Sequence, residues 1–87
     1  MKLKAHDKKV SEFSEIDKII LIPKKISEEF ALGAQKLKLD GKKTELRVYD
    51  VPCNCNKEMH THRVVDLRDV WDEMDIKDGD LLEIERW

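Results

Sequence analysis

The apolar and polar positions of this chain predict short strands and helices whose order occurs twice. In the first half, residues 18–22 form a β-branched run, which favours a strand. Pro23 follows at a position suited to the first turn of a helix, and Ile26 and Phe30, four residues apart, share one helical face. Residues 35–39 then alternate between polar and apolar, which predicts another strand.

The second half predicts the same order of elements. Residues 62–65 form a short strand, and Asp66 is a good N-cap for a helix over residues 67–75. An exit turn at residues 76–80 leads into a strand at residues 81–84. The apolar residues of this helix have the spacing of one stripe that faces a core: Leu67, Val70, Trp71 and Met74.

The apolar residues of the two halves coincide when the sequence is shifted by 44 residues. The shift places Ile20 on Val64, and one inserted residue at the later turn brings Leu37 onto Leu82. Apolar matches at the core positions favour an internal repeat over coincidence.

A further strand is expected at the start of each half, over residues 2–13 and 44–53. The sequence therefore predicts one domain, residues 1–87, with pseudo-repeats at about 1–43 and 44–87. The predicted class is mainly β with two short helices. Two interlocked β-β-α-β units would form a pseudo-two-fold barrel with few free strand edges.

Two segments resemble motifs of known families. Residues 19–30 are similar to the Ile-Pro-Lys segment of AbrB/SpoVT-type swapped-hairpin domains, and residues 76–85 resemble the Gly-Asp box that closes the same motif. Double-psi β-barrels share this box, and both groups belong to the cradle-loop barrels. The resemblance implies a duplicated barrel of double-psi or swapped-hairpin type. The first half departs from the box, because Gln35 stands where a counterpart of Gly79 is expected.

The most specific chemistry lies in a ten-residue segment that holds both cysteines and two histidines: Cys53, Cys55, His60 and His62. Side chains two residues apart on a strand point to the same face, so each pair faces together. If the strands pair across a four-residue loop, Cys55 opposes His60 and Cys53 opposes His62. Four donors then converge at distances suited to a metal ion. The segment therefore predicts a metal site on a β-hairpin.

Two thiolates with two neutral imidazoles favour Zn²⁺, with Fe²⁺ or cobalt as substitutes. A filled tetrahedral set leaves no open position for water, which indicates a structural zinc knuckle. Three other interpretations stay open. The four residues are ordinary strand and surface residues, or Cys53 and Cys55 form a redox pair. Alternatively His60 and His62 with Asp66 resemble the first metal motif of cupins, although the glycines and second histidine motif of that family are missing.

Length and composition limit the protein to one globular domain. The 87 residues have room for one core, and 40% apolar residues argue against disorder despite 41% charged residues. The longest apolar run, residues 19–22, is too short for a membrane span, and the first residues lack a secretory signal. The cysteines are too close for an unstrained disulfide, so we expect a reducing, cytoplasmic environment and no membrane partner.

Charge is unevenly distributed in this chain of net charge -2. Residues 1–44 hold 11 Lys and 7 acids, a sum of +4, whereas residues 45–87 hold 6 basic and 12 acidic residues, a sum of -6. This asymmetry can mark a binding surface, although solvated lysines explain it equally well. AbrB-type domains bind DNA as dimers, and the candidate contacts to nucleic acid here are Lys24, Lys25, Lys42, Lys43 and Arg47.

Two hypotheses for function follow. The chain is an AbrB-like DNA-binding transcription regulator, or it is a protein-interaction adaptor that resembles the double-psi domains preceding AAA unfoldases. No Gly-rich phosphate loop or nucleophile elbow is present, so a metal-dependent enzyme is the last hypothesis and we expect no enzyme. Trp71 and Trp87 are interpreted as core and terminal packing. We expect a monomer or a homodimer.

Overall fold

The computed structural model of the chain describes residues 1–53 and 60–87, with the backbone alone at Cys53 and His60. In chain order the elements are β1 (Lys2–Asp7), β2 (Lys18–Leu21), the 3-10 helix η1 (Lys24–Glu29), β3 (Gly33–Leu39), β4 (Lys42–Cys53), β5 (His60–Asp66) and β6 (Leu81–Arg86).

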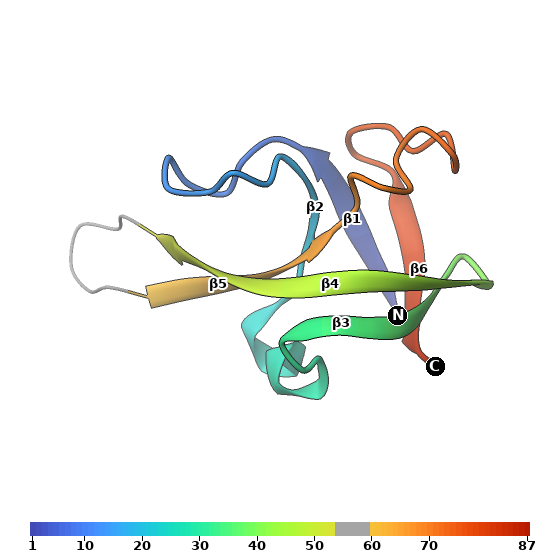
Figure 1. Ribbon diagram of the computed structural model, residues 1–87, viewed down its shortest axis with the longest axis horizontal. Helices are drawn as coiled ribbons and strands as arrows, with labels where there is room; N and C mark the ends of the chain where they lie inside the picture. The colour runs from blue at the N-terminus through green and yellow to red at the C-terminus, as the bar shows by residue number, and fades with distance from the viewer. Residues whose placement is uncertain (54–59) are drawn as a thin grey trace.

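The strands close into a barrel in the order β1-β2-β5-β4-β3-β6, and every neighbouring pair is antiparallel (Figure 1). Alternate residues of each strand point inward and form one apolar core. An inward residue from each strand, in chain order, is Leu3, Ile20, Leu37, Val48, Val65 and Leu82. The structure thus confirms a mainly β protein and a closed barrel.

The β4–β5 hairpin is buried on both of its faces. Val48 and Val65, opposite each other, face the barrel interior, whereas Val51 and Val64 belong to a second apolar cluster outside it. Ile16 packs in this outer cluster from the segment between β1 and β2, which crosses the hairpin (Figure 1). This double burial explains why the run at Val64 and Val65 is continuously apolar.

The predicted first strand, residues 2–13, is too long, because β1 ends at Asp7. The chain then leaves the barrel and turns at Ser14, a buried residue whose hydroxyl donates to the Ile16 carbonyl and accepts from the Ile16 N–H. Serine competes in this way for backbone groups that a strand would pair. Residues 8–17 therefore cover the hairpin instead of extending β1.

The two predicted helices are wrong in type. The first is the 3-10 helix η1, and residues 67–75 form successive turns. The hydrogen bonds of these turns have mixed spans, from Val70 N–H to the Leu67 carbonyl and from Ile76 N–H to the Trp71 carbonyl. The apolar stripe is nevertheless buried as predicted, since Leu67, Val70 and Trp71 belong to the inner core. Tertiary burial, with the left-handed backbone of Asp75 (φ 52°), overrides the helical period.

The predicted alignment of the halves needs a correction in β2 and β5. A shift of 44 residues places Ile20, which faces the barrel interior, on Val64, which belongs to the outer cluster. The inward counterpart of Ile20 is Val65, one residue later, as Leu82 is the inward counterpart of Leu37. The cyclic strand order keeps all its neighbours when β1, β2 and β3 are exchanged with β4, β5 and β6. The duplication itself stays a prediction.

Candidate functional site

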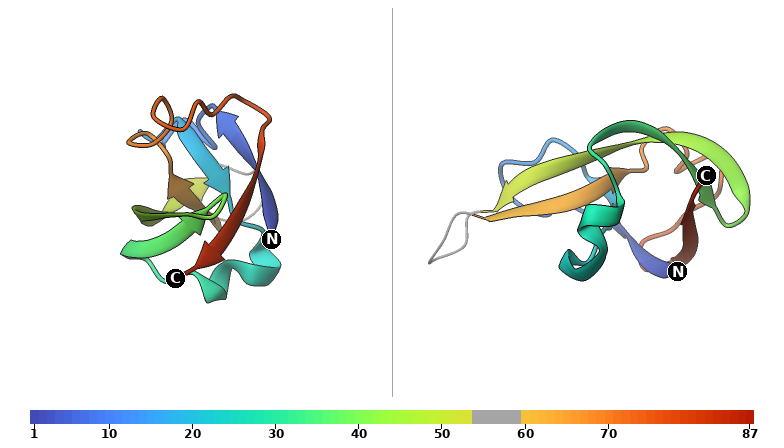
Figure 2. Two further views of the ribbon diagram at one scale, coloured as in Figure 1. Left: turned by 90° about the vertical axis from the view of Figure 1, so that its right-hand side faces the viewer. Right: turned by 90° about the horizontal axis from the view of Figure 1, so that it is seen from below.

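The ends of β4 and β5 project from the barrel as a two-stranded ribbon (Figures 1 and 2). The pairing of β3 with β4 ends at Val48, and the pairing of β2 with β5 ends at Val64. From there to Cys53 and His60 the two strands pair only with each other among the described residues. We call residues 49–53 and 60–63 the ribbon.

The ribbon places the predicted metal ligands in a register different from the predicted one. Cys53 lies opposite His60, and Val51 lies opposite His62. The predicted pairing, with Cys55 opposite His60, is wrong by two residues, because β4 ends at Cys53 and β5 begins at His60. An even shift leaves the alternation of faces along each strand unchanged. Only the backbone of Cys53 and His60 is described. Cys55 lies outside the described residues.

A metal site elsewhere is not supported. In residues 1–52 and 61–87, whose side chains are described, no three His, Cys, Asp or Glu side chains gather where they could hold a metal ion. His62 is half-buried and is one wall of a cavity described below. The four-ligand zinc set therefore stays a prediction, with two of its members opposite each other on paired strands.

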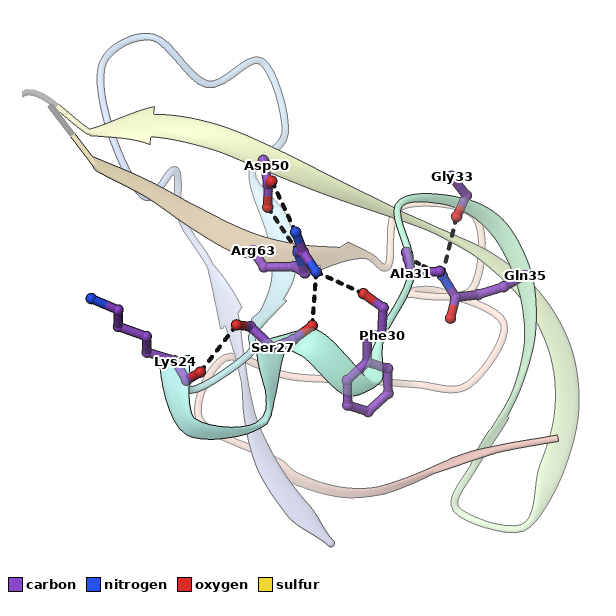
Figure 3. Close-up of polar contacts among 8 residues, drawn as sticks. All are labelled: Lys24, Ser27, Phe30, Ala31, Gly33, Gln35, Asp50 and Arg63. Atoms are coloured by element: carbon purple, nitrogen blue, oxygen red, sulfur yellow. Dashed lines mark hydrogen bonds and ion pairs between the residues drawn. The ribbon is translucent and has the colours of Figure 1, made fainter.

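The ribbon also carries an ion pair that the sequence analysis missed. Arg63 Nε and Nη2 donate to the two carboxylate oxygens of Asp50 at 2.9 and 3.1 Å. Arg63 Nη1 donates to the main-chain carbonyls of Ser27 and Phe30 at 2.8 and 3.0 Å (Figure 3). The guanidinium thus joins β4, β5 and the end of η1. The Phe30 carbonyl follows the end of η1, where carbonyls lack intrahelical partners, whereas the Ser27 carbonyl accepts from Arg63 in addition to the Phe30 N–H.

Both side chains are partly buried, with 22% of Arg63 and 28% of Asp50 exposed. The contact favours the charged form of each. The hydrogen bond from Arg63 lowers the pKa of Asp50, partial burial opposes this shift, and the charge of Arg63 adds to it. The same hydrogen bond raises the pKa of Arg63. Opposite charges at facing hairpin positions could have been recognised from the sequence once the register was known. The predicted register shift hid that signal.

A cavity of about 620 Å³ lies between η1 and the ribbon. Ile22 forms an apolar part of its wall. Its polar wall comes from Lys24, Ser27, Asp50, Thr61, His62 and Arg63.

The five predicted nucleic-acid contacts are divided between two places. Lys24 and Lys25 are exposed on η1, whereas Lys42, Lys43 and Arg47 are exposed on β4. Lys42 is partly neutralised, because its ammonium lies 3.0 Å from the Glu73 carboxylate. In Figure 1, η1 and the turn that begins β4 lie at different parts of the barrel. The five residues therefore do not form one basic stripe.

A basic surface does form on the outside of β3 and β4. Leu37 and Leu39 point into the core, so Lys36 and Lys38 point outward. Lys38 lies opposite Lys43, and Arg47 lies further along the same face of β4. Trp87 lies beside this surface, with Lys36 Nζ 4.9 Å and Lys43 Nζ 4.6 Å from its ring centroid. We define the basic face as Lys36, Lys38, Lys43, Arg47 and Trp87.

The two tryptophans differ in their surroundings. Trp71 is 7% exposed and belongs to the core, which confirms its predicted role. Trp87 is 54% exposed, so its predicted packing role is wrong. The main-chain N–H of Trp87 donates to the Lys36 carbonyl, which extends the β3–β6 pairing and holds the Trp87 backbone against the sheet. The exposed ring is a functional candidate that the strand pattern could not distinguish from a packed one.

No protein-family model, curated protein or solved structure matches this chain. The resemblance to cradle-loop barrels therefore rests on residues 19–30 and 76–85 alone. The structure supports the coarser feature, a small closed barrel of antiparallel strands. Among the described residues, no helix is long and apolar enough to cross a membrane.

Replacing Arg63 by methionine should destabilise the fold. The variant keeps the aliphatic stem but removes the guanidinium N–H groups that donate to the Asp50 carboxylate and to the Ser27 and Phe30 carbonyls. We expect the free energy of unfolding in urea to fall by roughly 1 to 3 kcal/mol. Arg68→Met is the control, because Arg68 is more exposed and pairs only with the neighbouring Asp66. Equal stability of the two variants would contradict the joining role of Arg63.

The contribution of Asp50 to stability should depend on pH. Its pKa is lower in the folded protein than the value of about 3.9 in an unfolded chain. The stabilisation is therefore complete above about pH 4 and is lost as the pH falls through the lower, folded pKa. We expect the stability difference between the wild type and Asp50→Asn to shrink below about pH 4, as measured by urea unfolding at several pH values. A constant difference would exclude an ionised Asp50 as the partner.

Proposed function

We propose that this protein is a small binding module that contacts nucleic acid through the basic face, with a structural zinc ion on the ribbon. The observation that carries the proposal is the Trp87 ring, more than half exposed and flanked by the ammonium groups of Lys36 and Lys43. An exposed aromatic ring among cations combines a surface for base stacking with contacts to phosphate.

The charge of the basic face supports this function although the whole chain is acidic. Its four cationic residues are interrupted by Glu45, opposite Lys36, and by Glu85, opposite Lys38. The local sum is therefore +4 - 2 = +2, against -2 for the chain. Affinity for nucleic acid depends on such local cations, because each phosphate contact releases counterions.

The form of nucleic acid that fits best is a single strand. A base can stack on Trp87 only when it is unstacked from its neighbours, as in single-stranded segments. The resemblance to AbrB-type domains favours duplex DNA and a transcription regulator instead. In both cases the barrel is proposed to be of the cradle-loop type, with a double-psi or swapped-hairpin connection.

The zinc ion is proposed to bind Cys53, Cys55, His60 and His62. The pairing of Cys53 with His60 supports this, since opposed residues of antiparallel strands bring their Cβ atoms within about 5.5 Å. The ribbon is paired on one side only, so a metal would add stability where the barrel adds little. Fe²⁺ is the alternative metal.

A protein partner is the second candidate function, and a separate observation favours it. The turns between β5 and β6 expose a group of carboxylates: Asp69, Asp72, Glu73, Asp75 and Asp78. These turns lie on the other side of the barrel from η1 and the C-terminus (Figures 1 and 2). Glu73 pairs with Lys42, and Asp69 lines a pocket with Arg47, so these two carboxylates adjoin the basic face. A basic protein partner could contact the other three.

Binding to nucleic acid should depend on Trp87. We expect a fluorescently labelled single-stranded oligonucleotide to bind with an affinity that falls steeply with salt, and Trp87→Ala to weaken it at least about 5-fold. Phe13→Ala is the control, because Phe13 is 58% exposed but lies in the segment between β1 and β2. Anisotropy titration measures both.

The outcomes of this titration separate the candidates. Preference for a duplex of the same sequence would favour the regulator of AbrB type over a single-strand binder. Absence of binding to either form at low salt would contradict a nucleic-acid function and leave the protein partner. Equal weakening by the two aromatic variants would remove Trp87 from the interface.

Removal of the metal should lower stability. We expect the purified protein to contain about one zinc per chain by elemental analysis, and a chelator or His60→Asn to lower the melting temperature by several degrees. His6→Asn is the control, since His6 lies on β1 and is not in the predicted set. A metal-free protein with the same melting temperature would contradict the zinc site.

A further inference from the structure

We propose that the cavity between η1 and the ribbon binds the phosphate group of a small phosphorylated molecule. The proposal is independent of the basic face, and the cavity shares His62 with the proposed zinc set. The cavity volume of about 620 Å³ lies in the range of cavities that hold small ligands. Six of its seven lining residues carry polar or charged side chains, which offers a ligand several hydrogen-bonding groups beside an apolar contact.

The cavity wall carries one cation whose charge is not compensated. Asp50 and Arg63 neutralise each other through their two-point contact. Lys24 forms no ion pair with any residue in the described part of the chain. Its side chain extends from η1, and its ammonium contacts none of the other residues drawn in Figure 3. The Asp50–Arg63 pair and Lys24 sum to +1, which favours an anion, and the Glu28 carboxylate near Arg63 offsets part of this charge.

The backbone of Thr61 adds donors to the same cavity. Its partner across the ribbon is Pro52, which has no N–H and whose carbonyl accepts from the Ser11 hydroxyl on the far side. The Pro52–Thr61 pair is thus a pair without mutual hydrogen bonds, and Thr61 directs its N–H away from β4. On that side, Ile22 N–H donates to the Arg63 carbonyl and β2 has already ended at Leu21. The main-chain N–H of Thr61 therefore points to the side where the cavity lies, and Thr61 is one of the lining residues.

The remaining donors fit a tetrahedral anion better than a planar one. Four N–H groups of Arg63 already have acceptors, and the two-point edge that would bind a ligand carboxylate is filled by Asp50. One Nη2 N–H remains, with the Thr61 amide and hydroxyl and the Lys24 ammonium. These are single donors from η1 and β5, as a tetrahedral anion requires. In Figure 3 the Lys24 ammonium points away from Arg63, so the Lys24 side chain has to turn toward the cavity to contact the same phosphate. Ile22 leaves an apolar contact for the rest of the ligand.

The experiment follows backbone amide and Arg Nε signals by NMR during titration with glycerol 3-phosphate, with glycerol as the uncharged comparison. We expect saturable shifts at Thr61 and Arg63 with glycerol 3-phosphate only. Lys24→Gln should weaken binding at least about 5-fold, the loss of one charged contact. Lys25→Gln is the matched control, because Lys25 is exposed on the same helix and is not part of the cavity wall.

Two results would overturn the proposal. One is the absence of saturable shifts at Thr61 and Arg63, and the other is equal weakening by Lys24→Gln and Lys25→Gln. Thr61→Val provides a second variant that keeps the strand and removes a donor hydroxyl. A single-stranded oligonucleotide that shifts the cavity signals when glycerol 3-phosphate does not would assign them to the nucleic-acid backbone and would also overturn it. Trp87→Ala should leave phosphate binding unchanged, which separates this test from that of the basic face.

Discussion

The arrangement of the hairpin and η1 depends on one guanidinium. Arg63, on β5, contacts a carboxylate on β4 and two carbonyls at the end of η1. It therefore links the hairpin to a segment 33 to 36 residues earlier in the chain. A six-residue 3-10 helix is too short to be stable by itself, and Arg63 offers its last carbonyls a fixed donor. The position of η1, and with it the cavity between η1 and the ribbon, follows from this contact. Hydrogen bonds to a charged donor are strong enough to hold it.

The ribbon separates its functions by the alternation of its side chains. Arg63 and Asp50 point to the face that meets η1, whereas Val51 points to the other face and belongs to the outer cluster. The ion pair and the outer cluster therefore hold the two strands from opposite faces. The register determines this separation, because a shift by one residue would exchange the two faces.

The sequence was sufficient for the strands and insufficient for the connections between them. Alternation and β-branched runs located five of the six strands within about two residues, because inward side chains must be apolar in a closed barrel. The predicted first strand began correctly and ended six residues too late. The prediction of a helix over residues 67–75 was wrong because buried turns can satisfy the same apolar spacing. The predicted ligand register was wrong by two residues because it assumed a four-residue loop over residues 56–59, whereas Cys53 pairs with His60. The Asp50–Arg63 pair depended on that register, and the exposure of Trp87 depended on which strands lie beside β6.

The total charge of this chain is a poor guide to its partners, since the fold separates charges that alternate in the sequence. Lys36 and Lys38 are collected on one outer surface by the period of β3, and Lys43 joins them through the pairing with β4. The carboxylates of residues 69–78 lie in the turns between β5 and β6, where Glu73 and Asp69 adjoin β4 through Lys42 and Arg47. An approaching polyanion responds to the charges within about one Debye length, roughly 8 to 10 Å, and not to the sum over the chain. A protein of net negative charge can therefore present a basic face to nucleic acid while its acidic turns stay available to a different, basic partner.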